Sequence, residues 1–159
     1  MNQVMKNVSF IIKKENEEVK KLIDQDTKKI LFETGLPDSK YINYDFIFDK
    51  ELTLLPDRII IGKFNKSDLI IDLNKNESIY VHSPDDGGLM YLNSSLSQLV
   101  GYILLYVDFM NKKIANPSNK RLYLDEWERK MIDLDKEAYF HENYYWGSFF
   151  ESYDIGMLI

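Results

Sequence analysis

Three side chains in the middle of the sequence could support acid–base chemistry. His82 is followed closely by Asp85 and Asp86, and an imidazole beside a carboxylate can act as a general acid–base pair. The same segment, Ser83–Gly88, is also typical of a turn, because it is rich in the Asp and Gly residues that turn conformations favour. The turn is the simpler interpretation, and a hydrolase using His82 with Asp85 or Asp86 is kept as an alternative.

Other kinds of catalytic or metal site fail on residue type or spacing. His141-Glu142 begins like the helix of a zinc protease, but Tyr145 stands where the second histidine is required. The chain has no cysteine and two histidines, which excludes thiol catalysis, thiolate-bound zinc and a zinc site of three histidines. The serines of Asn93-Ser94-Ser95 lie in no nucleophile elbow. Asp72 could be catalytic, but it is expected either to turn outward or to cap a hairpin backbone group. We therefore expect no enzymatic activity, no cofactor and no metal.

Charge is unevenly distributed along the chain. The 159 residues include 20 basic and 26 acidic side chains, so the net charge is −6 and a global basic surface for nucleic acid is absent. Residues 121–159 hold four of the basic and nine of the acidic residues, and they are also rich in aromatic residues. Acidic rims speed the capture of basic partners, and Tyr and Trp are common interface anchors.

These features predict a protein-binding surface in which carboxylates steer the partner and aromatic rings anchor it. Helical spacing with other apolar residues leaves open that the aromatic members, Trp146 above all, belong to the core instead. The candidate binding residues are Asp85, Asp86, Tyr145, Trp146, Glu151 and Asp154.

The apolar periodicity predicts helices on both sides of a group of strands. Helical spacing covers four stretches: Glu15–Glu33, Ser95–Asn111, 119–138 and 139–150. Gly35 and Pro37 supply the stop after the first of these. The third predicted helix is expected to turn Trp127 and Leu134 inward. Short alternating or β-branched runs predict strands at 44–48, 58–62, 68–73, 78–82 and 90–92.

This order of elements argues for one α+β domain over residues 1–159. The expected architecture is an antiparallel sheet of about four to six strands, with helices packed mainly on one face. The sequence contains no recognisable targeting segment and no apolar stretch of membrane-spanning length. We therefore expect a cytoplasmic protein without a membrane partner.

Four short motifs, taken in order, carry a family resemblance. They are Gly35-Leu36-Pro37 after the first helix, Ile61-Gly62 at the end of a strand, Ile70-Ile71-Asp72 in the next strand, and Asn93-Ser94-Ser95-Leu96 at the start of a long apolar helix. Together they resemble the SUKH superfamily, and most closely its fourth subgroup of bacterial immunity proteins, over residues 30–150. The chain departs from the family in the turn after Asp72, where Asn74-Lys75-Asn76 replaces a turn that often holds glycine.

The resemblance implies an α+β fold without enzymatic activity. Its members are thought to bind and neutralise a cognate toxin of a polymorphic toxin system, often a nuclease or a nucleic-acid deaminase. The partner would then be a protein toxin, with no direct contact to nucleic acid, and the immunity protein would be a monomer or a weak dimer. The alternative function is a scaffold or regulatory module of the same fold that binds other proteins.

Overall fold

The computed structural model describes residues 8–38 and 46–155, and they form an α+β fold. Six strands make an antiparallel sheet, in the order β3-β5-β6-β7-β8 with β4 also paired to β5. The strands of this sheet are β3 (Phe46–Ile47), β4 (Thr53–Leu55), β5 (Arg58–Phe64), β6 (Ser67–Asp72), β7 (Ser78–His82) and β8 (Leu89–Asn93). The predicted fold class is confirmed, and the predicted residues 44 and 45 lie outside the described part of the chain.

One face of the sheet builds the core. Ile59, Ile71 and Ile79 are paired with one another across β5, β6 and β7, and all three are fully buried. They belong to the same cluster as the apolar face of α3 (Leu96–Ala115), which includes Leu99 and Ile103. The β-branched runs of the sequence therefore meet the helical apolar stripe, as an α+β arrangement requires.

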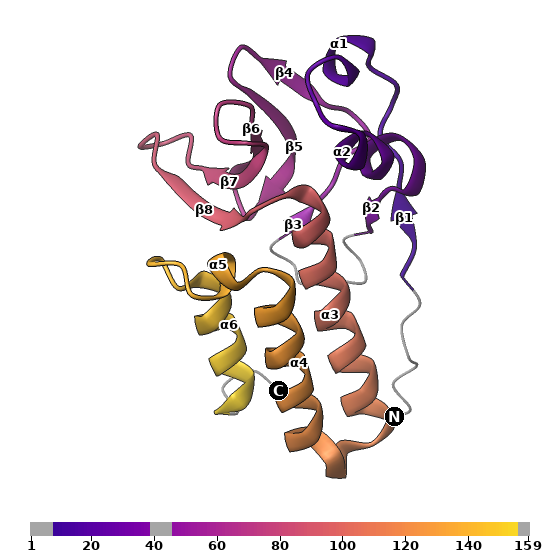
Figure 1. Ribbon diagram of the computed structural model, residues 1–159, viewed down its shortest axis with the longest axis vertical. Coiled ribbons are helices and arrows are strands. Elements are labelled where there is room, and N and C mark those ends of the chain that lie inside the picture. The colour runs from indigo at the N-terminus through magenta and orange to yellow at the C-terminus, as the bar shows by residue number, and fades with distance from the viewer. Residues whose placement is uncertain (1–7, 39–45, 156–159) are drawn as a thin grey trace.

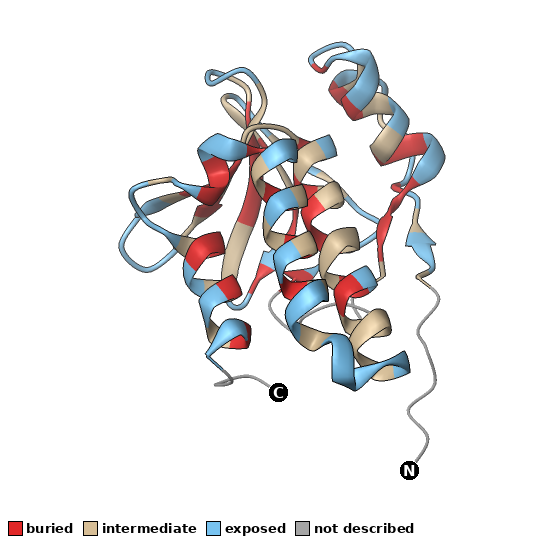
Figure 2. Ribbon diagram, turned by 60° about the horizontal axis from the view of Figure 1, so that its bottom comes forward, coloured by how far each residue is buried: buried red, intermediate tan, exposed pale blue. Residues whose placement is uncertain are grey.

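The helices that follow the sheet lie side by side beneath it (Figure 1). After α3 come the short 3-10 helix η3 (Pro117–Asn119), α4 (Lys120–Leu134), α5 (Lys136–Tyr139) and α6 (Tyr145–Asp154). Exposed residues predominate on their outer surfaces, and buried ones lie where they meet one another and the strands (Figure 2). None of the helices in the described residues has the length and apolar character needed to cross a membrane.

The predicted first helix is wrong as a single element. The chain forms α1 (Glu17–Lys20), then α2 (Gln25–Lys29), which continues into the π-helix η1 (Ile30–Thr34). Asp24 starts the second piece, because its side chain accepts a hydrogen bond from Thr27 N at 2.8 Å. Its own amide donates to Glu77 Oε2 at 3.1 Å, so the break also ties this corner to the β6–β7 turn.

The motif Gly35-Leu36-Pro37 ends one helix and forms a short strand. Gly35 ends η1 with a φ of +89°, a conformation that favours glycine. Leu36–Pro37 is then β2, which pairs with β1 (Phe10–Ile11) in a separate two-stranded ladder. Strands of two residues carry no periodic pattern, so neither was predicted.

The turn that follows Asp72 is a structural cap. Asp72 Oδ1 accepts a hydrogen bond from Asn74 N at 2.9 Å, which is the hairpin role expected for it. Asn76 and Glu77 complete the turn with φ values of 53° and 59°. Asparagine takes this left-handed conformation more readily than most residues, which explains how the turn forms without the glycine that the family often has.

A buried lysine joins the N-terminal segment to the sheet. Lys13 is 2% exposed, and its ammonium donates to the carbonyl oxygens of Asp49, Glu51 and Ile61. Burial outweighs the attraction of the neighbouring carboxylates and lowers the pKa of Lys13 to about 8.

Candidate protein-binding surface

A buried polar network fixes α5 and α6 against the end of the sheet. Asp135, 3% exposed, lies between α4 and α5 and accepts hydrogen bonds from Asn93 Nδ2 at 3.0 Å and from Ser94 N at 2.9 Å. Its other oxygen accepts from Ser94 Oγ at 2.7 Å and caps α5 through Ala138 N at 3.3 Å. The predicted helix 119–138 is therefore interrupted at Asp135, and Leu134 beside it is 37% exposed rather than inward as predicted.

The same network buries Trp146. Its indole nitrogen donates to Asn93 Oδ1 at 3.0 Å and to Leu92 O at 3.1 Å, and its ring stacks on Phe46 at 6.0 Å between centroids. Trp146 is 2% exposed. The expectation that it anchors a partner at the surface is wrong, because its ring and its donor are both occupied inside the core.

The connection from α5 to α6 is exposed but well held. Asn143 Nδ2 donates to Tyr91 O at 2.6 Å, and Asn143 Oδ1 accepts from Tyr145 N at 3.1 Å. His141 stacks on the Tyr91 ring at 4.4 Å. Tyr144 closes the turn through a bond from its amide to His141 O at 2.8 Å. A surface loop fixed in this way presents its side chains in a defined geometry.

Two tyrosine–carboxylate pairs lie beside this connection, one with its tyrosine exposed and one with its tyrosine buried. Tyr144 donates from its hydroxyl to Glu151 Oε1 at 2.7 Å along α6, and Tyr139 donates to Glu128 Oε2 at 2.5 Å between α5 and α4. The hydrogen bond to Glu151 raises the pKa of Tyr144, and burial together with the bond to Glu128 raises that of Tyr139. Glu128 and Glu151 each contribute to the raised pKa of both tyrosines, and the two pairs are together called the acidic cluster.

In the part of the chain that the structure describes, this cluster has no cation of its own. Within the described residues, no basic side chain forms an ion pair with Glu128 or Glu151. Beside it, Phe140 is 56% exposed and packs edge-on against Tyr139 at 4.9 Å. Tyr144 is 39% exposed. Uncompensated carboxylates beside exposed aromatic rings are the features that attract and hold a basic protein partner.

The other predicted binding residues are divided between several places. Glu151 belongs to the cluster, whereas Asp154 forms an ion pair with Arg121, which also pairs with Asp125. Tyr145 is half-buried, with its ring packed edge-on against Phe64 at 5.2 Å. Asp85 and Asp86 are exposed in the β7–β8 turn, a separate segment of the chain (Figure 1). The six residues therefore do not form one site.

The β7–β8 turn has the geometry of a turn motif. Asp86 Oδ1 accepts from Gly88 N at 2.8 Å, and Gly87 has a φ of +71°. Hydrogen bonds from Gly88 and Ser83 hold the pKa of the Asp86 carboxyl below its usual range. The carboxylate of Asp86 is thus used within the turn. No three histidine or acidic side chains of the described residues gather in a way that could hold a metal ion.

Ser94 and Ser95 also have structural partners. Ser95 caps α3, since its hydroxyl oxygen accepts from Gln98 N at 3.2 Å. Ser94 Oγ forms a hydrogen bond with the Tyr91 hydroxyl at 2.6 Å and donates a second hydrogen bond to Asp135. Asp135 already accepts four hydrogen bonds, so its carboxylate is occupied within this network. The motif Asn93-Ser94-Ser95 therefore links sheet, α3 and α5.

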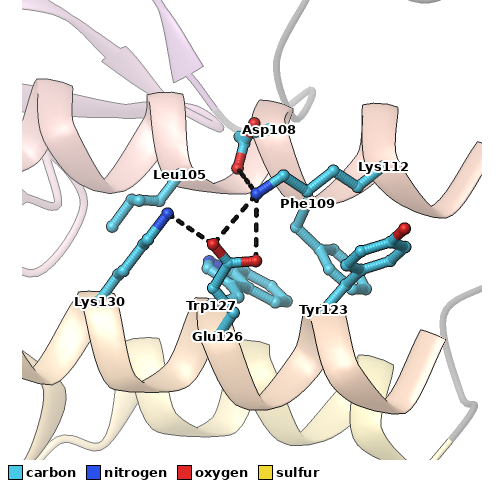
Figure 3. A pocket seen from close by; sticks show the side chains of 8 residues that line it. All are labelled: Leu105, Asp108, Phe109, Lys112, Tyr123, Glu126, Trp127 and Lys130. Atoms are coloured by element: carbon cyan, nitrogen blue, oxygen red, sulfur yellow. Dashed lines mark hydrogen bonds and ion pairs between the residues drawn. The ribbon is translucent and has the colours of Figure 1, made fainter. Parts of the chain in front are cut away.

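A small cleft lies on the outer side of α3 and α4 (Figure 3). The Lys112 ammonium stands between Asp108 at 2.9 Å and Glu126 at 3.1 Å, and Lys130 pairs with Glu126 at 2.8 Å. Beneath them Trp127 is buried, and its indole nitrogen has no hydrogen-bond partner among the described residues. The two lysines and two carboxylates neutralise one another and link α3 to α4. The indole nitrogen of Trp127 is a single buried donor, which does not specify a ligand.

Comparisons of the chain with protein-family models, curated proteins and solved structures give no match. A functional role is therefore inferred from the geometry of the acidic cluster.

Sequence reasoning missed Phe140, Tyr144 and the two pairs with Glu128 and Glu151. A signal existed for one pair, because Tyr144 and Glu151 are seven residues apart, which is two helical turns and the same helix face. The exposure of Phe140 has no such signal, since it follows from the interruption of the helix at Asp135.

Proposed function

We propose that the protein is an immunity protein that binds and neutralises a cognate protein toxin by forming a stoichiometric complex. The observation that carries the proposal is the acidic cluster of Glu128 and Glu151, each hydrogen-bonded to a tyrosine and neither paired with a cation in the described residues. The SUKH resemblance supplies the class of partner. A toxin that acts on nucleic acid needs a basic cleft, and an acidic surface can occupy such a cleft in competition with phosphate.

The proposed roles divide between charge and shape. Glu128 and Glu151 steer the encounter, so their effect falls as salt screens them. Phe140 supplies the apolar contact that slows dissociation once the complex has formed.

The test is growth rescue with the toxin domain encoded next to this gene, combined with recovery of the complex. Co-expression is expected to restore growth and to give a one-to-one complex. Phe140→Ala is expected to raise the dissociation rate constant about tenfold or more. Phe10→Ala is the matched control, because Phe10 is 44% exposed on β1, which lies away from α5 and α6 in Figure 1.

Two outcomes would contradict the proposal. Recovery of several unrelated partners and no toxin would favour the scaffold alternative. The second is rescue by the variants that equals rescue by the wild type. If neither Phe140→Ala nor the double variant Glu128→Gln, Glu151→Gln reduces rescue, this surface has no part in the mechanism.

A further inference from the structure

The Tyr144 ring lies at the start of α6, and one face of the ring packs against the backbone of Gly147. A Cβ added to Gly147 would lie 2.2 Å from Tyr144 Cε2 and 2.6 and 2.7 Å from its ring neighbours Cζ and Cδ2. These similar distances place the point above the face of the ring, because an approach in the ring plane would leave the two flanking atoms much farther away than Cε2. The glycine backbone therefore lies against one face of the ring, and Tyr144 as a residue is 39% exposed.

The hydroxyl of the same ring is tethered to a carboxylate. Tyr144 donates to Glu151 at 2.7 Å, and a phenol that donates to an anion is polarised so that electron density on the ring rises. Glu128 adds a second negative charge to the surroundings of Tyr144. The free face of the ring and the carboxylate are thus held together in one fixed unit.

The backbone at Tyr144 is in an unfavourable conformation. Its φ of 54° lies in the left-handed region that a residue with a bulky side chain rarely adopts. The bond from Tyr144 N to His141 O at 2.8 Å and that from Ser148 N to Tyr144 O at 2.9 Å hold it there. Backbone strain that the surroundings maintain at an exposed aromatic residue points to a function for that residue.

We propose that Tyr144 and Glu151 form a receptor for an arginine side chain of the basic partner. A planar guanidinium can stack on the free ring face and donate to the Glu151 carboxylate at the same time, which a compact ammonium does poorly. In the described residues, no cation lies over this ring and none pairs with this carboxylate, so the position is open to a partner. The inference rests on the proposed function only in taking the arginine to belong to the toxin.

The test uses the full chain and two peptides of equal charge, octa-arginine and octa-lysine, with binding measured by fluorescence anisotropy at low salt. The wild type is expected to bind octa-arginine about threefold or more tighter than octa-lysine. Tyr144→Leu should abolish this preference while leaving the octa-lysine affinity within about twofold. Glu151→Gln should weaken the binding of both peptides, with the larger loss for octa-arginine.

Controls separate a local effect from a folding defect. Tyr80→Leu removes a tyrosine whose ring already carries Lys75 at 4.7 Å, and it should keep the wild-type preference. Tyr144→Phe keeps the ring without the tether and should retain part of the preference. Thermal unfolding shows that each variant is folded, and amide chemical shifts show whether octa-arginine perturbs residues 144–151.

Equal affinity of the wild type for the two peptides would overturn the inference, and so would an unchanged preference in folded Tyr144→Leu. Toxin binding that persists together with either result would leave the immunity proposal standing without an arginine receptor. Arginine preference without any toxin complex would support the receptor and count against the immunity proposal.

Discussion

The ring of Tyr144 lies against the backbone of Gly147, so close that a Cβ on Gly147 would stand 2.2 Å from Tyr144 Cε2. A glycine in the first turns of a helix normally lowers stability by up to about 1 kcal/mol relative to alanine. Here the missing side chain leaves the space in which an exposed tyrosine is held. The position therefore couples helix stability to the presentation of the proposed binding surface.

Gly147→Ala is expected to displace the Tyr144 ring and weaken partner binding. In a Tyr144→Ala background the obstacle is gone, so the same change should stabilise the protein by about 0.5–1 kcal/mol through helix propensity. Urea unfolding of the two single variants and the double variant measures the coupling. An equal effect of Gly147→Ala with and without the tyrosine would contradict the contact.

Asp135→Ala is expected to destabilise the protein by about 3 kcal/mol or more, because it leaves the buried Asn93 amide and the Ser94 amide without an acceptor and removes the cap of α5. Asp133→Ala is the matched control, since Asp133 is exposed on the neighbouring turn and should change stability by less than about 0.5 kcal/mol. Denaturant unfolding measures both. Similar values for the two variants would show that the network is not a stabilising link.

Lys13 gives stability a distinctive dependence on pH. Its pKa is about 8 in the folded protein, against 10.5 for a lysine free of such surroundings, the value that applies once the chain unfolds. Between these values the unfolded chain binds more protons, so the contribution of Lys13 to the free energy of unfolding rises with pH, by about 2 kcal/mol from pH 8 to pH 10. Lys13→Met should remove this rise.

Tyrosine ionisation sets the upper pH limit at which the Lys13 effect can be measured. Burial raises the pKa of Tyr91 to about 12, and that of Tyr102 also rises. Above about pH 10 the unfolded chain therefore loses tyrosine protons first, and stability falls again. Unfolding followed from pH 7.5 to 9.5 isolates the lysine, and a flat wild-type profile in that window would contradict the assignment.

Two further glycines provide a test of which close contacts are costly. A Cβ on Gly62 would lie 2.3 Å from the backbone oxygen of Ile47, whereas one on Gly101 would meet the end of the Leu134 side chain at 2.4 Å. Backbone in a sheet cannot move away, but a partly exposed leucine can rotate. Gly62→Ala is expected to cost about 2 kcal/mol or more, and Gly101→Ala to cost little or to stabilise α3. Thermal unfolding of both variants would show the difference, and equal losses would contradict it.

The strands and the apolar helix α3 could be predicted because each has a continuous periodic pattern. Ile59, Ile71 and Ile79 lie in β-branched runs that fit a strand, and Leu96, Leu99 and Ile103 recur at helical spacing. The close approach at Gly62 coincides with a shift of register between β5 and β6.

The helix interruptions could not be predicted from periodicity. Asp24 and Asp135 each stand inside charged amphipathic stretches, where an aspartate is typical of a solvent-facing position. The capping bonds themselves are local, but each aspartate is also held by a partner distant in the sequence, Glu77 for the Asp24 amide and Asn93 for the Asp135 carboxylate. The prediction for Trp146 was wrong although its own helix carried the signal, because Trp146, Phe150 and Tyr153 recur at helical spacing and are all buried.

The hydrogen bonds from Asn143 to Tyr91 O and from Trp146 to Leu92 O have a consequence for solubility. β8 is the last strand of the sheet, and an open edge strand invites pairing with another molecule. Side chains from the α5–α6 region occupy two of its carbonyl groups. The segment that presents the acidic cluster to a partner therefore also protects the open edge of the sheet from edge-to-edge aggregation. Substitutions that loosen this segment should increase the tendency of the protein to self-associate.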